Sequence, residues 1–224
     1  MIVIINSATS IDGKIATRNG ESKISSHQDL QKLHRLRCHV DGVIVGISTV
    51  LKDDPLLTIR FAKCSNKKNP ARIIIDTRAR IPLKSRIVKT ASKVETIVVV
   101  SKEASREKIM KLIHKGIKII IVERKGNRVD LKRTFKILET EMGFKKILVE
   151  GGGEINWSVI KNNLFDELRV TVSPLIIGGK KAITLVEGKG FGKINECSKL
   201  KLLTVNKTAD GEIQIRYKNS NKIQ

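Results

Sequence analysis

Aromatic residues are scarce in this chain of 224 residues, at 3% of the total. Hydrophobic residues still make up 40%, so a core has to be built mainly from Ile, Val and Leu. The shortage of Phe, Tyr and Trp also argues against a surface that stacks nucleic-acid bases, although the net charge is +22. Because the Lys and Arg residues are scattered over every segment, we interpret this charge as a generally basic surface and expect no specific nucleic-acid partner.

Cysteine is also rare. Cys38, Cys64 and Cys197 are an odd number at wide spacing, which predicts free thiols and a cytoplasmic location. There is no C-x-x-C pair, and His34 and His39 are five residues apart, the wrong step for one face of a helix. We therefore expect no metal site.

Long hydrophobic runs are missing too. No apolar stretch approaches the ~20 residues that a membrane-spanning helix needs. The first residues, Met1 to Ile5, resemble a strand and not a signal peptide, because no basic segment precedes them and no small-residue cleavage site follows. These features predict a single domain over residues 1–218, a flexible tail at residues 219–224, and no membrane partner.

Short runs of Val and Ile alternate with amphipathic stretches along the chain. We expect strands at Ile2–Asn6, Gly42–Val45, Arg72–Ile75, Thr96–Val100, Ile117–Val122, Lys146–Val149 and Leu168–Val172. We expect helices at His27–His39 (with Ser26 as N-cap), Lys102–Lys115 and Leu131–Met142. Near the end, Leu200–Asn206 and Glu212–Lys218 alternate polar and apolar residues around an Asp210-Gly211 turn, which predicts a hairpin. The order indicates a three-layer α/β fold with a mostly parallel central sheet and a C-terminal antiparallel hairpin.

The segment Val149–Glu154 is the most informative motif, because a strand ends there in three glycines before a helix begins. Glycines let backbone N–H groups approach an anion, and a helix N-terminus adds partial positive charge. The pattern differs from the dinucleotide fingerprint G-x-G-x-x-G, since Asn156 stands at the third glycine position. Taken alone, the loop is either a phosphate site or a plain tight turn.

Four further polar segments follow expected strands. They are Ala8–Ala16, Val45–Arg60, Ile75–Arg78 and Ser173–Lys180. Within the second, a short helical stretch places Thr49 and Asp53 one turn apart on the same face. Ligands of open α/β sheets bind at the carboxyl ends of the strands, so these loops together predict a binding site.

In order along the chain, these segments resemble the reductase family of riboflavin biosynthesis. The matching residues are Ser10–Ala16, Gly20–Ser22, Thr49–Arg60 with its Asp53-Asp54-Pro55 turn, Glu150–Gly153 and Pro174–Gly179. The resemblance implies a dihydrofolate-reductase-like fold, NADPH as cofactor, and a homodimer. It also implies reduction of a phosphorylated ribosylaminopyrimidine to the ribitylamino product, by hydride transfer to the sugar C1′ of a ring-opened imine.

The resemblance assigns roles residue by residue. It places contacts to NADPH at Ala8, Thr49, Asp53, Thr77, Gly151, Gly152, Gly153, Glu154 and Ile155. It places contacts to the substrate at Ser22, Arg37, Leu57, Arg60 and Glu150. Arg37 and Arg60 suit the 5′-phosphate, because a guanidinium binds phosphate through two parallel hydrogen bonds.

We infer two further roles from the chemistry. Arg78 would meet the 2′-phosphate that distinguishes NADPH from NADH. Reduction of an imine is easier when its nitrogen is protonated, so a carboxylate near C1′ would stabilise that form, and Asp53 and Glu150 are the candidate catalytic residues.

Alternatives remain open on the sequence alone. The chain lacks the H-x-E and P-C-x-x-C segments of a zinc deaminase, which favours the diamino pyrimidinone as substrate over its deaminated uracil analogue. Another pteridine reductase of the same fold is a second alternative. A basic nucleic-acid-binding protein without enzymatic activity is a distant third, since it leaves the glycine loop and the Thr49–Arg60 segment unexplained.

Overall fold

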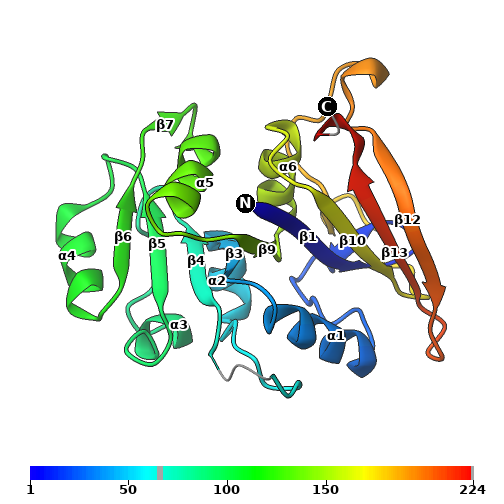
Figure 1. The fold of residues 1–224 in the computed structure, drawn as a ribbon, viewed down its shortest axis with the longest axis horizontal. Coiled ribbons are helices and arrows are strands. Elements are labelled where there is room, and N and C mark those ends of the chain that lie inside the picture. Colours follow the sequence, from blue (N-terminus) through cyan, green and yellow to red (C-terminus); the bar gives the residue numbers. More distant parts are fainter. Residues whose placement is uncertain (65–67, 223–224) are drawn as a thin grey trace. The chain divides into compact units, whose positions relative to one another are not determined.

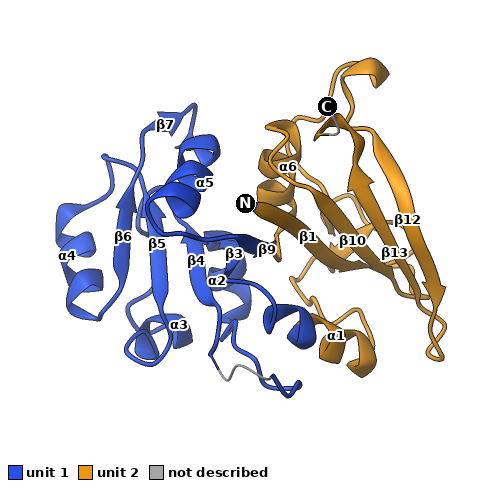
Figure 2. Ribbon diagram, viewed as in Figure 1, with its two compact units in different colours: residues 1, 34–148 blue, residues 2–33, 149–224 orange. Residues whose placement is uncertain are grey.

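The computed structural model describes residues 1–64 and 68–222, and the chain divides into two compact units. Unit 1 contains Met1 and His34–Leu148, whereas unit 2 contains Ile2–Leu33 and Val149–Gln224 (Figure 2). Unit 1 is thus nearly continuous in sequence, and unit 2 joins two segments from opposite ends of the chain.

Unit 1 is built on strands that neighbour one another in the order β9-β3-β4-β5-β6 (Figure 1), and the last residue of β9, Val149, already belongs to unit 2. Their bounds are Gly42–Gly46 (β3), Ala71–Ile75 (β4), Thr96–Val100 (β5), Lys118–Ile121 (β6) and Lys146–Val149 (β9). The pairs β3–β4, β4–β5 and β5–β6 are parallel. Every residue of β3, β4 and β5 is buried, which explains why these strands are nearly continuous runs of Val and Ile.

The helices of unit 1 follow its strands. They are Ile47–Asp53 (α2), Arg86–Lys89 (α3), Arg106–His114 (α4) and Leu131–Thr140 (α5), and a small hairpin joins Arg124–Lys125 (β7) to Arg128–Val129 (β8). The expected start of α4 at Lys102 is wrong. The helix begins at Arg106 because Ser105 is its N-cap and accepts a hydrogen bond from the Lys108 N–H.

Helix α1 (His27–Arg37) has the expected N-cap, since the Ser26 hydroxyl accepts a hydrogen bond from the Asp29 N–H at 3.2 Å. The buried carboxylate of Glu212, from the distant end of the chain, accepts hydrogen bonds from the Ser26 backbone and hydroxyl at 2.6 and 2.8 Å. The start of α1 is therefore fixed to the C-terminal segment of unit 2.

Unit 2 orders its strands β12-β13-β10-β1. Ile2–Thr9 (β1) and Glu167–Val172 (β10) are parallel, whereas Ile213–Asn219 (β13) pairs antiparallel with β10 and with Leu200–Lys207 (β12). Lys14–Ala16 (β2) and Ile183–Thr184 (β11) form a small separate pair, and Gly153–Lys161 (α6) follows β9. The expected α/β fold, mostly parallel with a C-terminal antiparallel hairpin, is confirmed.

The end of the described chain continues the structure of unit 2. Asn219 is the last residue of β13, is fully buried, and donates hydrogen bonds to the Asn163 side chain and the Phe165 carbonyl. Residues 220–222 form a 3-10 turn, and residues 223–224 of the expected tail lie outside the described residues. The prediction of one domain over residues 1–218 stays a prediction.

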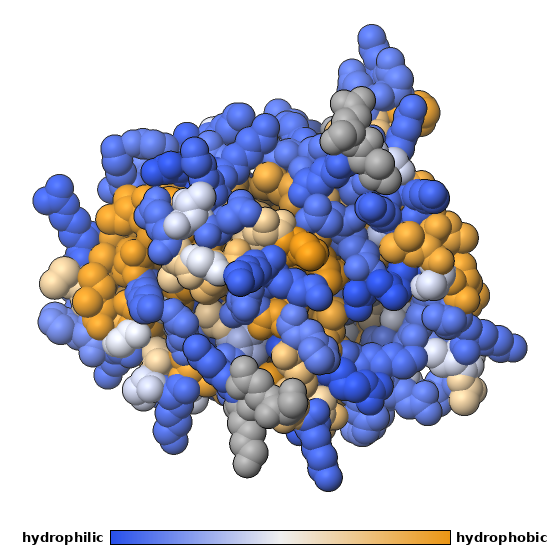
Figure 3. Space-filling model, viewed as in Figure 1, coloured by the Kyte–Doolittle hydropathy of each residue, from blue (hydrophilic) through white to orange (hydrophobic). Residues whose placement is uncertain are grey.

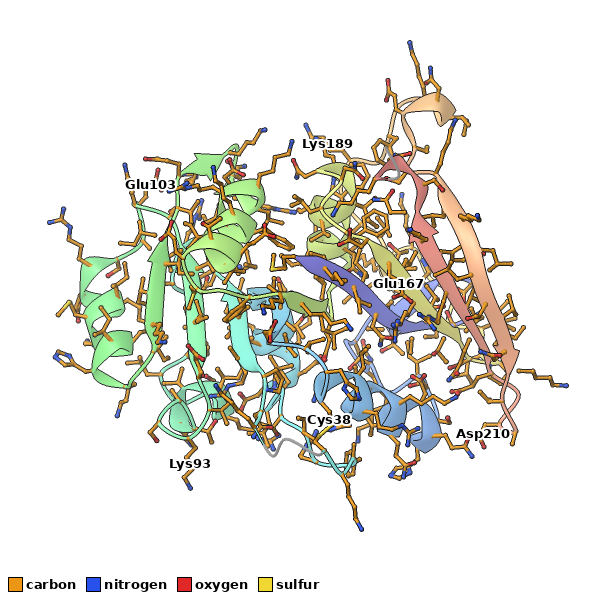
Figure 4. The ribbon with its side chains drawn as sticks, in the orientation of Figure 1. Cys38, Lys93, Glu103, Glu167, Lys189 and Asp210 are labelled. Carbon is orange, nitrogen blue, oxygen red and sulfur yellow. A yellow bond between two sulfur atoms is a disulfide. The ribbon has the colours of Figure 1, made fainter. Side chains whose placement is uncertain are left out.

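The expectation of three free thiols is wrong. Cys38, which follows α1 and is labelled in Figure 4, forms a disulfide with Cys64, with their Cα atoms 5.7 Å apart. Cys197 is free. The two bonded cysteines are 26 residues apart in sequence. Their spacing alone does not reveal the pairing, because it depends on the 57–64 segment returning to the end of α1.

Hydrophilic side chains cover most of the face drawn in Figure 3, as the charge of the chain predicts. Apolar side chains gather over the β12–β13 hairpin, where Leu202 and Val205 are 51% and 54% exposed. In the part of the chain that the structure describes, no helix has the length and apolar character to cross a membrane.

Candidate functional site

In unit 1, the last turn of α1 holds the segment that carries Arg60. The side chain of Arg37 is buried, and its Nη1 donates a hydrogen bond to the Thr58 carbonyl at 2.7 Å. The backbone N–H of Arg60 donates to Nδ1 of His34 at 2.8 Å. Arg37 and Arg60, for which the family resemblance implies contact with a phosphate, are thus brought to one place by α1.

This place is rich in positive charge. Partial burial lowers the pKa of Arg60, and the nearby guanidinium groups of Arg37 and Arg86 lower it further. Neighbouring cations that repel one another favour an anion between them, and guanidinium groups match the geometry of phosphate. Arg86, which sequence reasoning missed, belongs to the same cluster.

The backbone between α2 and Arg60 takes an unusual course. Asp54 and Leu57 have positive φ angles of 38° and 52°, although neither is glycine. The Asp54 carboxylate accepts a hydrogen bond from the Arg86 N–H at 2.8 Å, and Leu57 is buried. These contacts show why the Asp53-Asp54-Pro55 segment is more than a helix-ending turn.

Arg72 supports the same segment from β4 and was not anticipated from the sequence. Its guanidinium is fully buried, and all its hydrogen bonds go to hydroxyl or carbonyl oxygens. The acceptors are Leu56 O, Ile87 O, Val94 O, Thr90 Oγ1 and Thr96 Oγ1. Burial lowers the pKa of Arg72 to about 10, so the group stays charged at neutral pH.

The predicted positions of Thr49 and Asp53 are confirmed as far as the backbone is concerned. Both lie in α2, one turn apart, with Thr49 half-buried and Asp53 exposed. Their roles toward a cofactor stay predictions.

Thr77 and Arg78 follow β4. The Thr77 hydroxyl accepts a hydrogen bond from the Val129 N–H at 3.3 Å, and a hydroxyl in that position can still donate to a ligand. Arg78 is exposed. Asp76 is different, because it is fully buried, its pKa is raised by burial, and its carboxylate accepts the Ile81 N–H at 2.8 Å. Asp76 therefore shapes the turn, whereas Thr77 is half-buried and Arg78 is exposed.

In unit 2, the glycine loop forms as expected, with β9 ending at Val149, Glu150 half-buried, and α6 beginning at Gly153. Gly151 has a φ of +95°, a conformation that favours glycine, and the peptide bond between Gly151 and Gly152 is cis. A Cβ on Gly153 would lie 2.5 Å from the Thr184 carbonyl oxygen. Glycine at that position is thus required by packing.

Asn156 lies just inside α6 and is fully buried. Its Nδ2 donates to the Leu185 carbonyl at 2.8 Å, and its Oδ1 has no hydrogen-bond partner among the described residues. The first turn of α6 offers backbone N–H groups and the positive end of the helix dipole. The first turn of α6 therefore fits a ligand that carries an anionic group for the backbone N–H groups and a hydrogen-bond donor for Asn156 Oδ1.

Two loops of unit 2 singled out in the sequence are bound to each other. The Asp12 carboxylate accepts hydrogen bonds from the N–H groups of Ile177 and Gly178 at 3.0 and 2.7 Å. The bond from Ile177 is the main reason why the pKa of Asp12 falls to about 2, and the Ser10 hydroxyl contributes to it. The Asp-Gly turn thus anchors the 174–179 loop.

The remaining candidates of unit 2 are placed simply. Ala8 is half-buried in β1, opposite Thr171 of β10, and Ser22 is exposed in the segment before α1. Glu154 and Ile155 lie in the first turn of α6.

Among the residues that the structure describes, no group of three or more His, Cys, Asp or Glu side chains is arranged to hold a metal ion.

Comparison with known proteins shows what the chain is similar to. The family model of the RibD C-terminal domain matches residues 1–213. The 2,5-diamino-6-ribosylamino-4(3H)-pyrimidinone 5′-phosphate reductase of Methanothermobacter thermautotrophicus is 38% identical over 200 residues, covering 89% of this chain and 90% of the relative. The enzyme of the same name from Archaeoglobus fulgidus is 36% identical over 199 residues, covering 85% and 88%.

A solved structure, RibD from Acinetobacter baumannii in its second form, superposes with a TM-score of 0.83 at 26% identity. The match covers 98% of this chain and 58% of that one.

Proposed function

Since the chain belongs to the RibD C-terminal domain family, we propose that it reduces 2,5-diamino-6-ribosylamino-4(3H)-pyrimidinone 5′-phosphate to the ribitylamino product in riboflavin biosynthesis. The observation that carries this proposal is the 38% identity to a reductase of that name over 90% of its length. The reaction is an oxidoreduction that needs a nicotinamide cofactor.

The arginine cluster of unit 1 supports a phosphorylated substrate. We assign the 5′-phosphate to Arg37 and Arg60, since both side chains lie in a patch whose charges repel one another when no anion is bound. Leu57, Ser22 and Glu150 are the further substrate contacts that we propose. Replacing Arg60 with Ala should raise KM far more than it lowers kcat, because the phosphate is remote from the reacting C1′.

NADPH is the cofactor that we propose. The first turn of α6, with buried Asn156 and the glycines before it, fits an anionic group of a dinucleotide. Ala8, Thr49, Asp53, Thr77, Gly151, Gly152, Gly153, Glu154 and Ile155 are the proposed contacts. Arg78 is exposed and would pair with the 2′-phosphate. When bound, reduced nicotinamide supplies the hydride.

The chain's own residues would prepare the substrate for that hydride. Opening of the ribosylamine gives a C1′=N double bond, which gains a hydride at carbon and a proton at nitrogen. We propose that Asp53 or Glu150 stabilises the protonated nitrogen through its carboxylate. If Asp53→Asn and Glu150→Gln both kept near-normal turnover, this electrostatic role would be wrong.

The first experiment is to follow oxidation of NADPH with the diamino pyrimidinone phosphate and, separately, with its deaminated uracil analogue. Turnover of the first alone supports the proposed substrate. Turnover of the second alone would assign the chain to the step after deamination. Binding of NADPH without turnover of either would refute the substrate assignment while leaving the fold and cofactor in place.

We also propose a homodimer. Strand β12 lies at the end of its sheet and exposes Leu202 and Val205, and an unpaired apolar edge strand is a common place for a second copy to bind. Light scattering measures the mass directly, and Leu202→Lys should shift a dimer toward monomer.

A cytoplasmic location is a further proposal, supported by membership in a biosynthetic family and no longer by the cysteines.

A further inference from the structure

Three residues hold the segment 57–64 in place: two lie on one face of α1, and the third directly follows the helix. His34 accepts the backbone N–H of Arg60, Arg37 donates to the carbonyl of Thr58, and Cys38 is bonded to Cys64. Positions i, i+3 and i+4 lie on the same face of a helix, so these three contacts all come from one face of α1. His34 stands at the centre of this arrangement, although no role in binding is assigned to it above.

The imidazole of His34 is fully buried. Its Nδ1 accepts hydrogen bonds from the N–H groups of Arg60 at 2.8 Å and of Phe61 at 3.5 Å, so the neutral ring must carry its proton on Nε2. The Phe61 ring packs edge-on against His34, with ring centroids 4.8 Å apart. The guanidinium of Arg60 lies 5.2 Å from the centroid of the same Phe61 ring.

These contacts fix both ends of the Arg60 residue. Its backbone is bound to His34, and its side chain rests on a ring that His34 supports. Without such restraint, repulsion from Arg37 and Arg86 would drive the Arg60 guanidinium away before an anion arrives. Nδ1 of the neutral His34 ring restrains Arg60 without adding another positive charge to the cluster.

We propose that His34 is a positioning residue for phosphate recognition: its Nδ1 fixes the backbone of Arg60 so that the guanidinium groups of Arg60 and Arg37 are arranged for the anion before it binds. This inference rests on the proposed function only in identifying the anion as the 5′-phosphate of the substrate. Preorganisation of this kind improves affinity because less side-chain freedom is lost on binding.

The test compares two amide replacements. His34→Asn can place its amide oxygen near the position of Nδ1 and keep the acceptor, whereas His34→Gln reaches toward Nε2 and leaves the Arg60 N–H without its partner. The probe is ribose 5-phosphate, with binding measured by calorimetry on the full chain. His114→Asn is the matched control, because His114 is an exposed histidine of the same unit.

We expect His34→Gln to weaken binding of ribose 5-phosphate by about 10-fold, and His34→Asn to stay within about 3-fold of the parent chain. The dissociation constant for NADPH should stay unchanged in both. In an Arg60→Ala background, His34→Gln should cause no further loss, because its effect passes through Arg60. Thermal unfolding of each variant verifies that it is folded.

Equal losses in the Asn and Gln variants would overturn the proposal, as would an undiminished effect of His34→Gln in the Arg60→Ala background. Absence of measurable ribose 5-phosphate binding by the parent chain would overturn it as well. Because the probe undergoes no reduction, these outcomes are independent of turnover. A failure of the proposed reaction appears only in the NADPH assay.

Discussion

Acidification should destabilise this protein through His34. Burial, followed by the charges of Arg37 and Arg60, lowers the pKa of His34 from 6.5 to about 4. The unfolded chain takes up a proton on this imidazole as the pH falls below about 6.5, whereas the folded chain does so only near pH 4. The contribution of His34 to stability is therefore complete above pH 6.5 and is lost as the pH falls toward 4.

The magnitude follows from the same two values. The difference between 6.5 and about 4 corresponds to about 3 kcal/mol in the free energy of unfolding, at 1.36 kcal/mol per pKa unit. Carboxylates titrate in part of the same range, so the parent chain alone does not isolate the effect. His34→Asn removes the titrating group while keeping an acceptor for the Arg60 N–H.

The assay is urea unfolding of the parent chain and of His34→Asn at several pH values between 7.5 and 4.5. The difference in unfolding free energy between the two should change by about 2 to 3 kcal/mol across this range, with the parent chain losing more. Parallel stability curves would refute the reasoning, because they would mean that the folded protein protonates His34 as readily as the unfolded chain does.

Three further changes have defined outcomes. Arg72→Lys should lower the unfolding free energy by about 3 kcal/mol or more, because lysine has too few donors for the acceptors around Arg72 and leaves buried oxygens unpaired; urea titration measures this. Reduction of Cys38–Cys64 should lower it by about 3 to 4 kcal/mol by releasing a constraint on the unfolded chain, and an unchanged melting temperature with dithiothreitol would contradict this. Arg78→Ser should raise KM for NADPH and leave KM for NADH nearly unchanged, whereas equal effects on both would exclude pairing with the 2′-phosphate.

Much of the fold could be predicted because hydrophobic periodicity is local. The runs Thr96–Val100 and Lys146–Val149 are strands with the expected bounds, since a buried parallel strand needs an unbroken apolar sequence. The start of α4 could not be placed as well. Ser101 and Ser105 are both possible N-caps, and only the structure shows that the helix begins after Ser105.

The candidate site was predictable where chemistry follows directly from residue type, as in the guanidinium groups of Arg37 and Arg60. It was not predictable where a residue acts through tertiary contacts. The sequence places Arg72 at the start of an expected strand, but it does not show that the guanidinium is fully buried with neutral acceptors. His34 and the disulfide of Cys38 could have been suspected only from their shared helix face with Arg37.

The division of the chain also has a consequence for its synthesis on the ribosome. All of unit 1 apart from Met1 is a single stretch, so its synthesis is complete while the rest of the chain is still being made. Strand β1 leaves the ribosome long before its parallel partner β10, which begins only at Glu167. At a synthesis rate of about 5 to 20 residues per second, β10 becomes available roughly ten to thirty seconds after β1. During that interval, the apolar residues of β1 are a natural target for chaperones.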